Sequence, residues 1–159
     1  MALTLPTIAP VGYALDYSDF LKTKSGKDGR TTIITGTVTV PSGTVSGTLI
    51  GLFPFNKGFK LASQASIVAV TAMGASVTLA LGYQYYDSAT GSSNTAIYAA
   101  ASSTAAAGGV IPMQVTAGLI LDAAGDGWVT ALTGGATTSG SSTITYNMLF
   151  NYDISGVTN

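Results

Sequence analysis

Alternation of apolar and polar side chains with a period of two residues is the feature that most constrains how this chain folds. The clearest run places Val77, Leu79, Leu81, Tyr83 and Tyr85 at every second position. Residues 31–40 alternate in the same way, with Thr35, Thr37 and Thr39 on one face, and so do residues 144–154 near the end of the chain. Because successive side chains of a strand point to opposite faces, these runs predict half-buried β-strands.

About eight such strands are predicted, and no strand–helix–strand alternation occurs among them. Segments 44–53, 65–70, 110–115, 119–121 and 128–133 supply the shorter strands, and 65–70 is apolar on both faces, as in an interior strand. The Ala-rich segment 96–107 predicts one short helix, ended by Gly108 and Gly109. The expected fold is all-β: an antiparallel, jelly-roll-like β-sandwich in residues 31–159, preceded by an extended arm in residues 1–30.

Two connections are predicted from turn residues. Phe53–Gly58 contains Pro54 and Gly58 and is expected to turn the chain. Asp122–Gly127 is expected to form a tight hairpin connection, with Trp128 and the following residues pairing back along the preceding strand.

The scarcity of charge excludes several classes of function. Only 8 % of the 159 residues are charged, the formal net charge is −1, and the chain contains no His, no Cys and no Glu. His and Cys nucleophiles or bases, thiolate metal sites and disulfides are therefore excluded, and we expect no enzymatic activity, no cofactor and no metal. A net charge near zero also gives no field that would attract nucleic acid, and neither long uncharged stretch predicts a membrane span.

The first 30 residues contain candidate partner contacts. Pro6 and Pro10 favour an extended chain, and apolar and aromatic side chains follow at short intervals. Four of the six basic residues then fall within nine positions, which indicates either a solvated loop or an electrostatic contact with an acidic partner surface. The candidate contact residues are Tyr13, Tyr17, Phe20, Lys22, Lys24, Lys27 and Arg30.

Three other groups of residues have a functional and a structural interpretation. Asp122 and Asp126 with Gly127 have part of a calcium-loop pattern but lack its further oxygen ligands, which favours a turn. Asp16 and Asp19 lie near lysines, so ion pairing is favoured over acid–base chemistry. The Tyr83–Tyr86 region is either part of a sheet face or a sugar-stacking platform.

Several segments, taken in order, resemble capsid decoration (cement) proteins of tailed bacteriophages. These are Gly51–Leu61 leading into 65–70, Val77–Tyr83, the Ala-rich segment 96–107, Gly127–Thr130 and Ile144–Asp153. The resemblance covers roughly residues 50–155 and implies a β-sandwich that binds the outside of an assembled head and stabilises it, often as trimers at local symmetry axes.

The sequence thus predicts a non-enzymatic virion structural protein, made in a host cytoplasm and located on the capsid surface. Its expected partners are the major capsid protein and further copies of itself, with a trimer favoured. The first alternative is a tail, fibre or surface adhesin module that recognises a host glycan or protein through Tyr83–Tyr86 or loop 87–94. A second is a subunit that polymerises into a tube, pilus or layer by strand donation.

Overall fold

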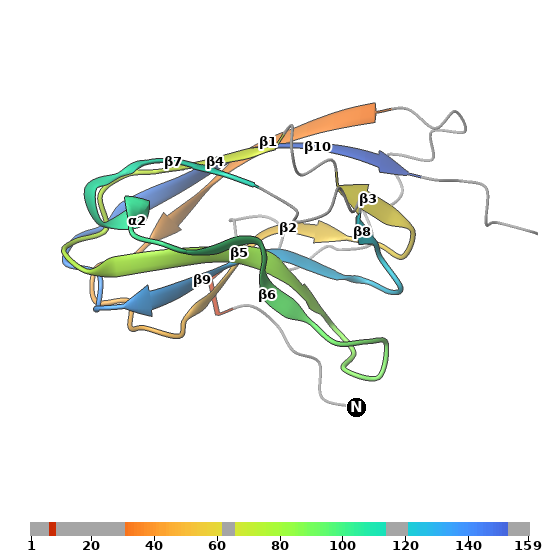
Figure 1. Ribbon diagram of the computed structural model, residues 1–159, viewed down its shortest axis with the longest axis horizontal. Helices are drawn as coiled ribbons and strands as arrows, with labels where there is room; N and C mark the ends of the chain where they lie inside the picture. The colour runs from red at the N-terminus through yellow and green to blue at the C-terminus, as the bar shows by residue number, and fades with distance from the viewer. Residues whose placement is uncertain (1–6, 9–30, 62–65, 114–120, 153–159) are drawn as a thin grey trace, which may run out of the picture.

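The computed structural model describes residues 7–8, 31–61, 66–113 and 121–152, which form two antiparallel sheets packed face to face (Figure 1). The elements are β1 (Thr31–Val40), β2 (Leu49–Phe55), β3 (Phe59–Leu61), β4 (Ile67–Val70), β5 (Val77–Tyr85), β6 (Asn94–Ser102), α2 (Thr104–Ala107), β7 (Gly109–Pro112), β8 (Leu121–Asp122), β9 (Gly127–Gly135) and β10 (Ser142–Tyr152). The predicted antiparallel β-sandwich is confirmed.

The long strand β10 organises the six-stranded sheet. On one side β10 pairs with the whole of β1, from Thr31 opposite Asn151 to Val40 opposite Ser142. On its other side β10 pairs with β4 and then with β3, and β7 and β8 continue the sheet outward from these two strands. The second sheet has the order β2-β9-β5-β6, so its two central strands come from distant parts of the sequence.

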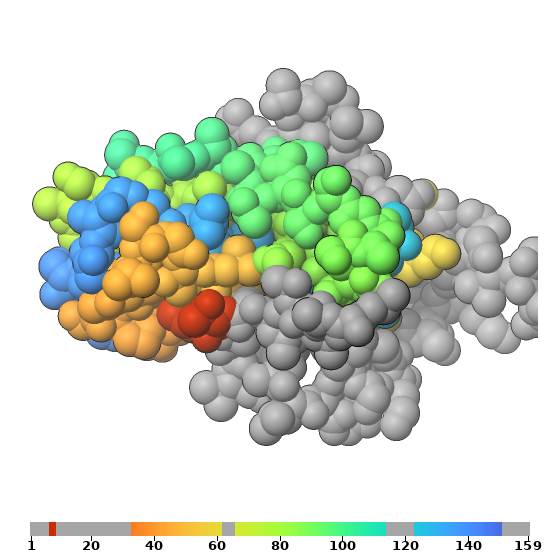
Figure 2. Space-filling view, turned by 90° about the horizontal axis from the view of Figure 1, so that it is seen from below, coloured from red at the N-terminus to blue at the C-terminus, as the bar shows by residue number. Residues whose placement is uncertain are grey.

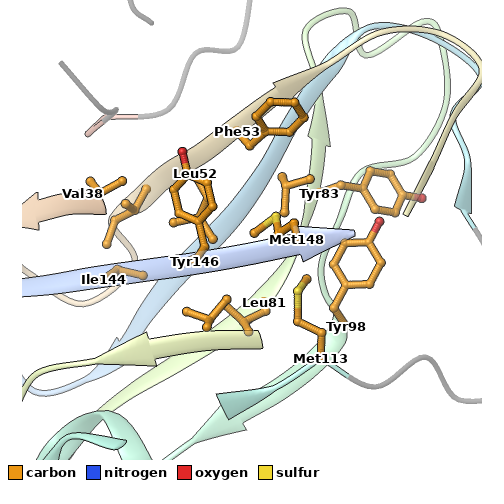
Figure 3. Close-up of a cluster of buried hydrophobic side chains, with 14 of the residues drawn as sticks. Val38, Leu52, Phe53, Leu81, Tyr83, Tyr98, Met113, Ile144, Tyr146 and Met148 are labelled. Carbon is orange, nitrogen blue, oxygen red and sulfur yellow. The ribbon is translucent and has the colours of Figure 1, made fainter. Parts of the chain in front are cut away.

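One hydrophobic core lies between the sheets. Leu52 and Leu81 from the four-stranded sheet face Ile144, Tyr146 and Met148 from β10 (Figure 3). Phenylalanine rings from both sheets cluster farther along the core, at Phe53, Phe55, Phe59 and Phe150. The predicted strand faces are the faces that line this core, since Val77, Leu79 and Leu81 are fully buried.

The strands with the most regular alternation are found where the sequence predicts them. β1 spans the predicted 31–40, β5 spans 77–85, and β10 covers most of the predicted 144–154. In β10 the buried residues Ile144, Tyr146 and Met148 alternate with Thr145 and Asn147, which are exposed.

The helix predicted over 96–107 is wrong for most of its length. Residues 94–102 form β6, which pairs with β5, and only Thr104–Ala107 form a single helical turn. Tyr98 is fully buried, so this segment is anchored in the core by one large side chain despite the helix propensity of its alanines. Gly108 ends the turn with φ of +83°, as predicted from the Gly–Gly pair.

The turn predicted at Phe53–Gly58 begins too early. Phe53, Pro54 and Phe55 belong to β2, and a register shift occurs between Gly51 and Phe53. A proline is tolerated there because β2 is the last named strand at its edge of the sheet. Only Asn56–Gly58 turn the chain, into the unpredicted short strand β3.

Two further expectations are corrected. Asp122–Gly127 is not a tight hairpin, because β8 pairs with β3 in one sheet whereas β9 pairs with β2 and β5 in the other. Strand β4 is not buried on both faces either, since Ile67 is 44 % exposed. Alternation within a segment specifies neither which strand pairs with it nor whether its outer face is covered.

Candidate interaction surfaces

All charged residues of the described ranges lie in β3, in β8 or in the β2–β3, β5–β6 and β8–β9 connections, which lie together at one end of the sandwich (Figure 1). They are Lys57, Lys60, Asp87, Asp122 and Asp126. The carboxylate oxygen Oδ1 of Asp126 accepts a hydrogen bond from the backbone N–H of Lys57 at 2.9 Å, and the Asp126 carbonyl accepts one from Tyr86 N–H at 3.0 Å. Lys60 and Asp122 are opposite each other in the β3–β8 register. We call this part of the molecule the charged end.

The opposite end is built from four uncharged loops, residues 41–48, 71–76, 103–108 and 136–141, which lie together on one side of Figure 1. Backbone hydrogen bonds join these loops. Thr138 N–H donates to the Thr44 carbonyl at 3.0 Å, and Met73 N–H donates to the Ala105 carbonyl at 2.9 Å. Val45 is 59 % exposed there. This uncharged end is therefore held by main-chain contacts and presents Ser, Thr, Gly and apolar side chains.

The outer face of the six-stranded sheet is uncharged over the rows that join β1, β10, β4 and β7. One row contains Thr35, Asn147, Ile67 and Pro112, and the next contains Thr37, Thr145, Ala69 and Val110. Ile33, Ile67 and Val110 on this face are 62, 44 and 54 % exposed, and they are three of the four large exposed hydrophobic residues in the described ranges. We call this surface the threonine face.

The outer face of the four-stranded sheet is different, because its central residues are buried. By alternation Thr130 and Ala80 point away from the core, yet they are only 0 and 6 % exposed. Gly82 lies on the same face, and a Cβ atom added there would clash with the backbone of Asn94 and Thr95 in β6. Among the described strands, the open sheet face is thus the threonine face.

Tyr83 and Tyr85 are buried in the core and do not form a sugar-stacking platform. They are 8 and 5 % exposed, and their rings contact each other with centroids 5.2 Å apart. The Tyr83 hydroxyl donates to the Ser92 carbonyl at 3.2 Å, and the Tyr85 hydroxyl accepts from Ala124 N–H at 3.2 Å. Both hydroxyls therefore hold loops of the charged end in place.

The candidate contacts of the arm, Tyr13, Tyr17, Phe20, Lys22, Lys24, Lys27 and Arg30, lie outside the described residues, as do Asp16 and Asp19. Thr7 and Ile8 are the described part of the arm, and they lie against the β2 region of the same chain (Figure 2, red beside orange). Ile8 is paired with Ile50 in a parallel bridge, and Gly51 N–H donates to its carbonyl at 2.6 Å. The start of the arm thus extends the edge of the four-stranded sheet.

Within the described ranges no three His, Cys, Asp or Glu side chains come together as metal ligands. The same part of the chain contains no helix of the length and hydropathy that a membrane span requires.

Buried tyrosines are expected to make stability depend on pH only in the alkaline range. Burial raises the pKa of Tyr86 to about 12, and burial also raises the pKa of Tyr83 and Tyr98 above the ordinary value of 10. A raised pKa means that the folded state holds its protons more tightly than the unfolded state does. The stabilisation is therefore complete below about pH 10 and is lost as the pH rises from about 10 towards 12.

Urea unfolding as a function of pH checks this expectation. Since the chain has no His and no Cys, the free energy of unfolding should be constant between about pH 6 and 9 and should fall above pH 10. Replacing Tyr98 by Phe should reduce the alkaline fall. A large change in the free energy of unfolding near neutral pH would contradict the assignment of the pH dependence to the tyrosines.

Comparison with solved structures relates this fold to bacteriophage capsids. A chain of the structure "Capsid of Ralstonia phage GP4" superposes with a TM-score of 0.63 and 20 % identity, over 80 % of this chain and 87 % of that one. A chain of "Cyanophage Pam1 capsid asymmetric unit" superposes with a TM-score of 0.57 and 15 % identity, over 79 % of this chain and 86 % of that one. The protein shares its fold with both chains.

Sequence comparison adds no family. No family model matches the chain, and the search of curated proteins finds no significant match. The likeness to the capsid chains is thus a likeness of fold, extending over nearly the whole length of those chains.

Proposed function

We propose that the protein is a non-enzymatic structural component of a phage virion, and specifically a decoration protein that binds the outside of the assembled head and stabilises it. The observation that carries the proposal is the shared fold, which accounts for 87 and 86 % of two chains found in solved phage capsids. The segments that resemble cement proteins lie in the part of the chain that forms the sandwich.

The distribution of charge supports binding through a large protein surface. The threonine face and the uncharged end can be covered by another protein without removing any charged group from water, which avoids a desolvation cost of several kcal/mol per ion. Interface cores are depleted of charged residues in the same way. The charged end, with Lys57 and Asp126, is suited to face solvent.

The size of the threonine face indicates that one such contact is not sufficient. Four strands about 4.8 Å apart and about seven residues long cover roughly 400 Å², about half of what one partner contributes to a standard interface. Stable attachment therefore calls for further contacts. Because Thr7 and Ile8 pair with β2 of the same chain, the start of the predicted arm does not cross. We propose that the rest of the arm, residues 9–30, crosses to another chain, and that copies associate, with a trimer as the favoured state.

Locating the protein on the native particle tests the proposed function. Antibodies raised against the purified protein should label the outer surface of intact heads in electron micrographs. Heads from which the protein has been removed should carry no label. Label confined to the tail or its fibres would instead favour the adhesin alternative. Binding of the isolated protein to an array of glycans would then test that alternative. No label on any virion would overturn the proposal.

A further inference from the structure

The edge of β1 is unusual because, in the part of the chain that the structure describes, no device protects it against pairing with another chain. β1 has ten residues and pairs with β10 in continuous register, without a bulge. Its sequence, TTIITGTVTV, contains no charged residue and no proline. Within the described ranges β1 pairs on one side only. Long, regular, uncharged edge strands readily pair with further strands, so natural proteins cover or interrupt them.

The other edge strands of the two sheets are either short or interrupted by a proline or a register shift. β7 has four residues and ends at Pro112, and β8 has only two residues. β6 contains two register shifts against β5. β2 contains Pro54 and a register shift, and Ile8 already pairs with it. Since four edges are interrupted and β1 is not, we expect β1 to have a partner in the functional state.

We propose that β1 pairs in antiparallel orientation with β1 of a second copy of this chain, across a two-fold axis near Gly36. The two residues on either side of Gly36 match in kind, Thr35 with Thr37 and Ile34 with Val38, so the centre of the strand is complementary to itself. In this register Thr35 lies opposite Thr37 of the second copy on the threonine face, and Ile34 lies opposite Val38 towards the core. No charge is buried, and the two six-stranded sheets become continuous.

This contact is of a different kind from the trimer of the proposed function. A two-fold contact uses the same strand of both partners, whereas a trimer closes through a heterologous contact. Pairing through β1 therefore joins one closed oligomer, or one single chain, to the next. The inference does not depend on whether the protein is a virion component.

Disulfide formation tests the orientation and register, because the natural chain has no cysteine. The single variants Ile33→Cys, Thr35→Cys, Thr37→Cys and Thr39→Cys are mixed in pairs, allowed to exchange subunits and mildly oxidised. Mixtures of positions equidistant from Gly36, namely 35 with 37 and 33 with 39, should give covalent dimers, because directly opposite Cα atoms lie about 4.5–5.5 Å apart, within the range that a disulfide can bridge. Mixtures of 33 with 35 and of 37 with 39 should give few. Val45→Cys, on an exposed loop, is the control for random collision.

Paired lysine substitutions test the contact through the mass of the protein in solution, which falls when copies dissociate. The variant Thr35→Lys/Thr37→Lys places like charges opposite each other at the proposed contact. Its control, Asn147→Lys/Thr145→Lys, adds the same charge at the registered positions of β10 on the same face. Both variants remove the hydrogen bond between Thr37 Oγ1 and Thr145 Oγ1, which are 3.2 Å apart.

The mass measurement distinguishes association through the β1 edge from association through the threonine face. By analytical ultracentrifugation the natural protein and the control should have at least twice the mass of the β1 variant. Equal masses for all three proteins would overturn the proposal. Loss of association in both variants would also overturn it, because the contact would then belong to the threonine face rather than to the β1 edge.

Discussion

Replacement of Phe59 by alanine is expected to lower the free energy of unfolding by about 3–5 kcal/mol. Phe59 is fully buried, and its ring centroid lies 5.2 Å from that of Phe55 and 5.2 Å from that of Phe150. Phe55 belongs to the four-stranded sheet, whereas Phe59 and Phe150 belong to the six-stranded sheet. Removing the ring therefore leaves a cavity at a point where the two sheets are held together.

Urea unfolding followed by far-UV circular dichroism measures this effect. A domain of this kind has a total stability of about 5–15 kcal/mol, so Phe59→Leu is included as a milder variant that retains a folded baseline. Val45→Ala is the control, since Val45 is 59 % exposed. The control should change stability by less than about 0.5 kcal/mol. If Phe59→Ala lowered the free energy of unfolding no more than the control does, the cluster of phenylalanine rings would not hold the two sheets together.

Elements predicted well from the sequence are those in which one strand face is buried and the other is exposed. In β1, Ile34 and Val38 are buried while Thr35 and Thr37 are exposed, so the alternation in the sequence is the alternation of the structure. β10 follows the same rule. The threonine face could thus be anticipated as a polar strand face from residues 31–40, although its extension to Ile67 and Val110 could not, because that depends on which strands pair with β10.

Elements predicted poorly depend on contacts between distant segments. The alanines of residues 96–107 favour a helix locally, yet pairing with β5 and burial of Tyr98 place most of the segment in a strand. β3 has three residues, too few for a periodic signal, and it exists because it pairs with β10 and β8. The charged end likewise brings together Lys57 and Asp126 from distant parts of the chain.

Deletion of residues 1–30 is expected to abolish binding to shells assembled from the major capsid protein while leaving the sandwich folded. The predicted arm contains three aromatic residues and four basic ones, and aromatic anchors at interfaces commonly contribute 2 kcal/mol or more each, about a 30-fold change in affinity per residue. The deletion also removes the bridge between Ile8 and Ile50, so a loss of stability of about 1–2 kcal/mol is expected as well. Co-sedimentation with shells measures binding, and circular dichroism measures folding.

Two variants that retain residues 1–30 separate loss of the anchors from loss of the Ile8 contact. Tyr13→Ser/Tyr17→Ser/Phe20→Ser removes the aromatic anchors, and replacing Lys22, Lys24, Lys27 and Arg30 by Gln removes the charges. Both variants keep Thr7 and Ile8, which pair with β2.

If the aromatic anchors supply binding affinity, the first variant should bind shells as poorly as the deletion variant does. If the charges act mainly on encounter and register, the second should slow association and make binding less dependent on salt. Shell binding by the deletion variant at the level of the natural chain would show that the arm is not the attachment, and the threonine face and the uncharged end would then have to supply the whole contact.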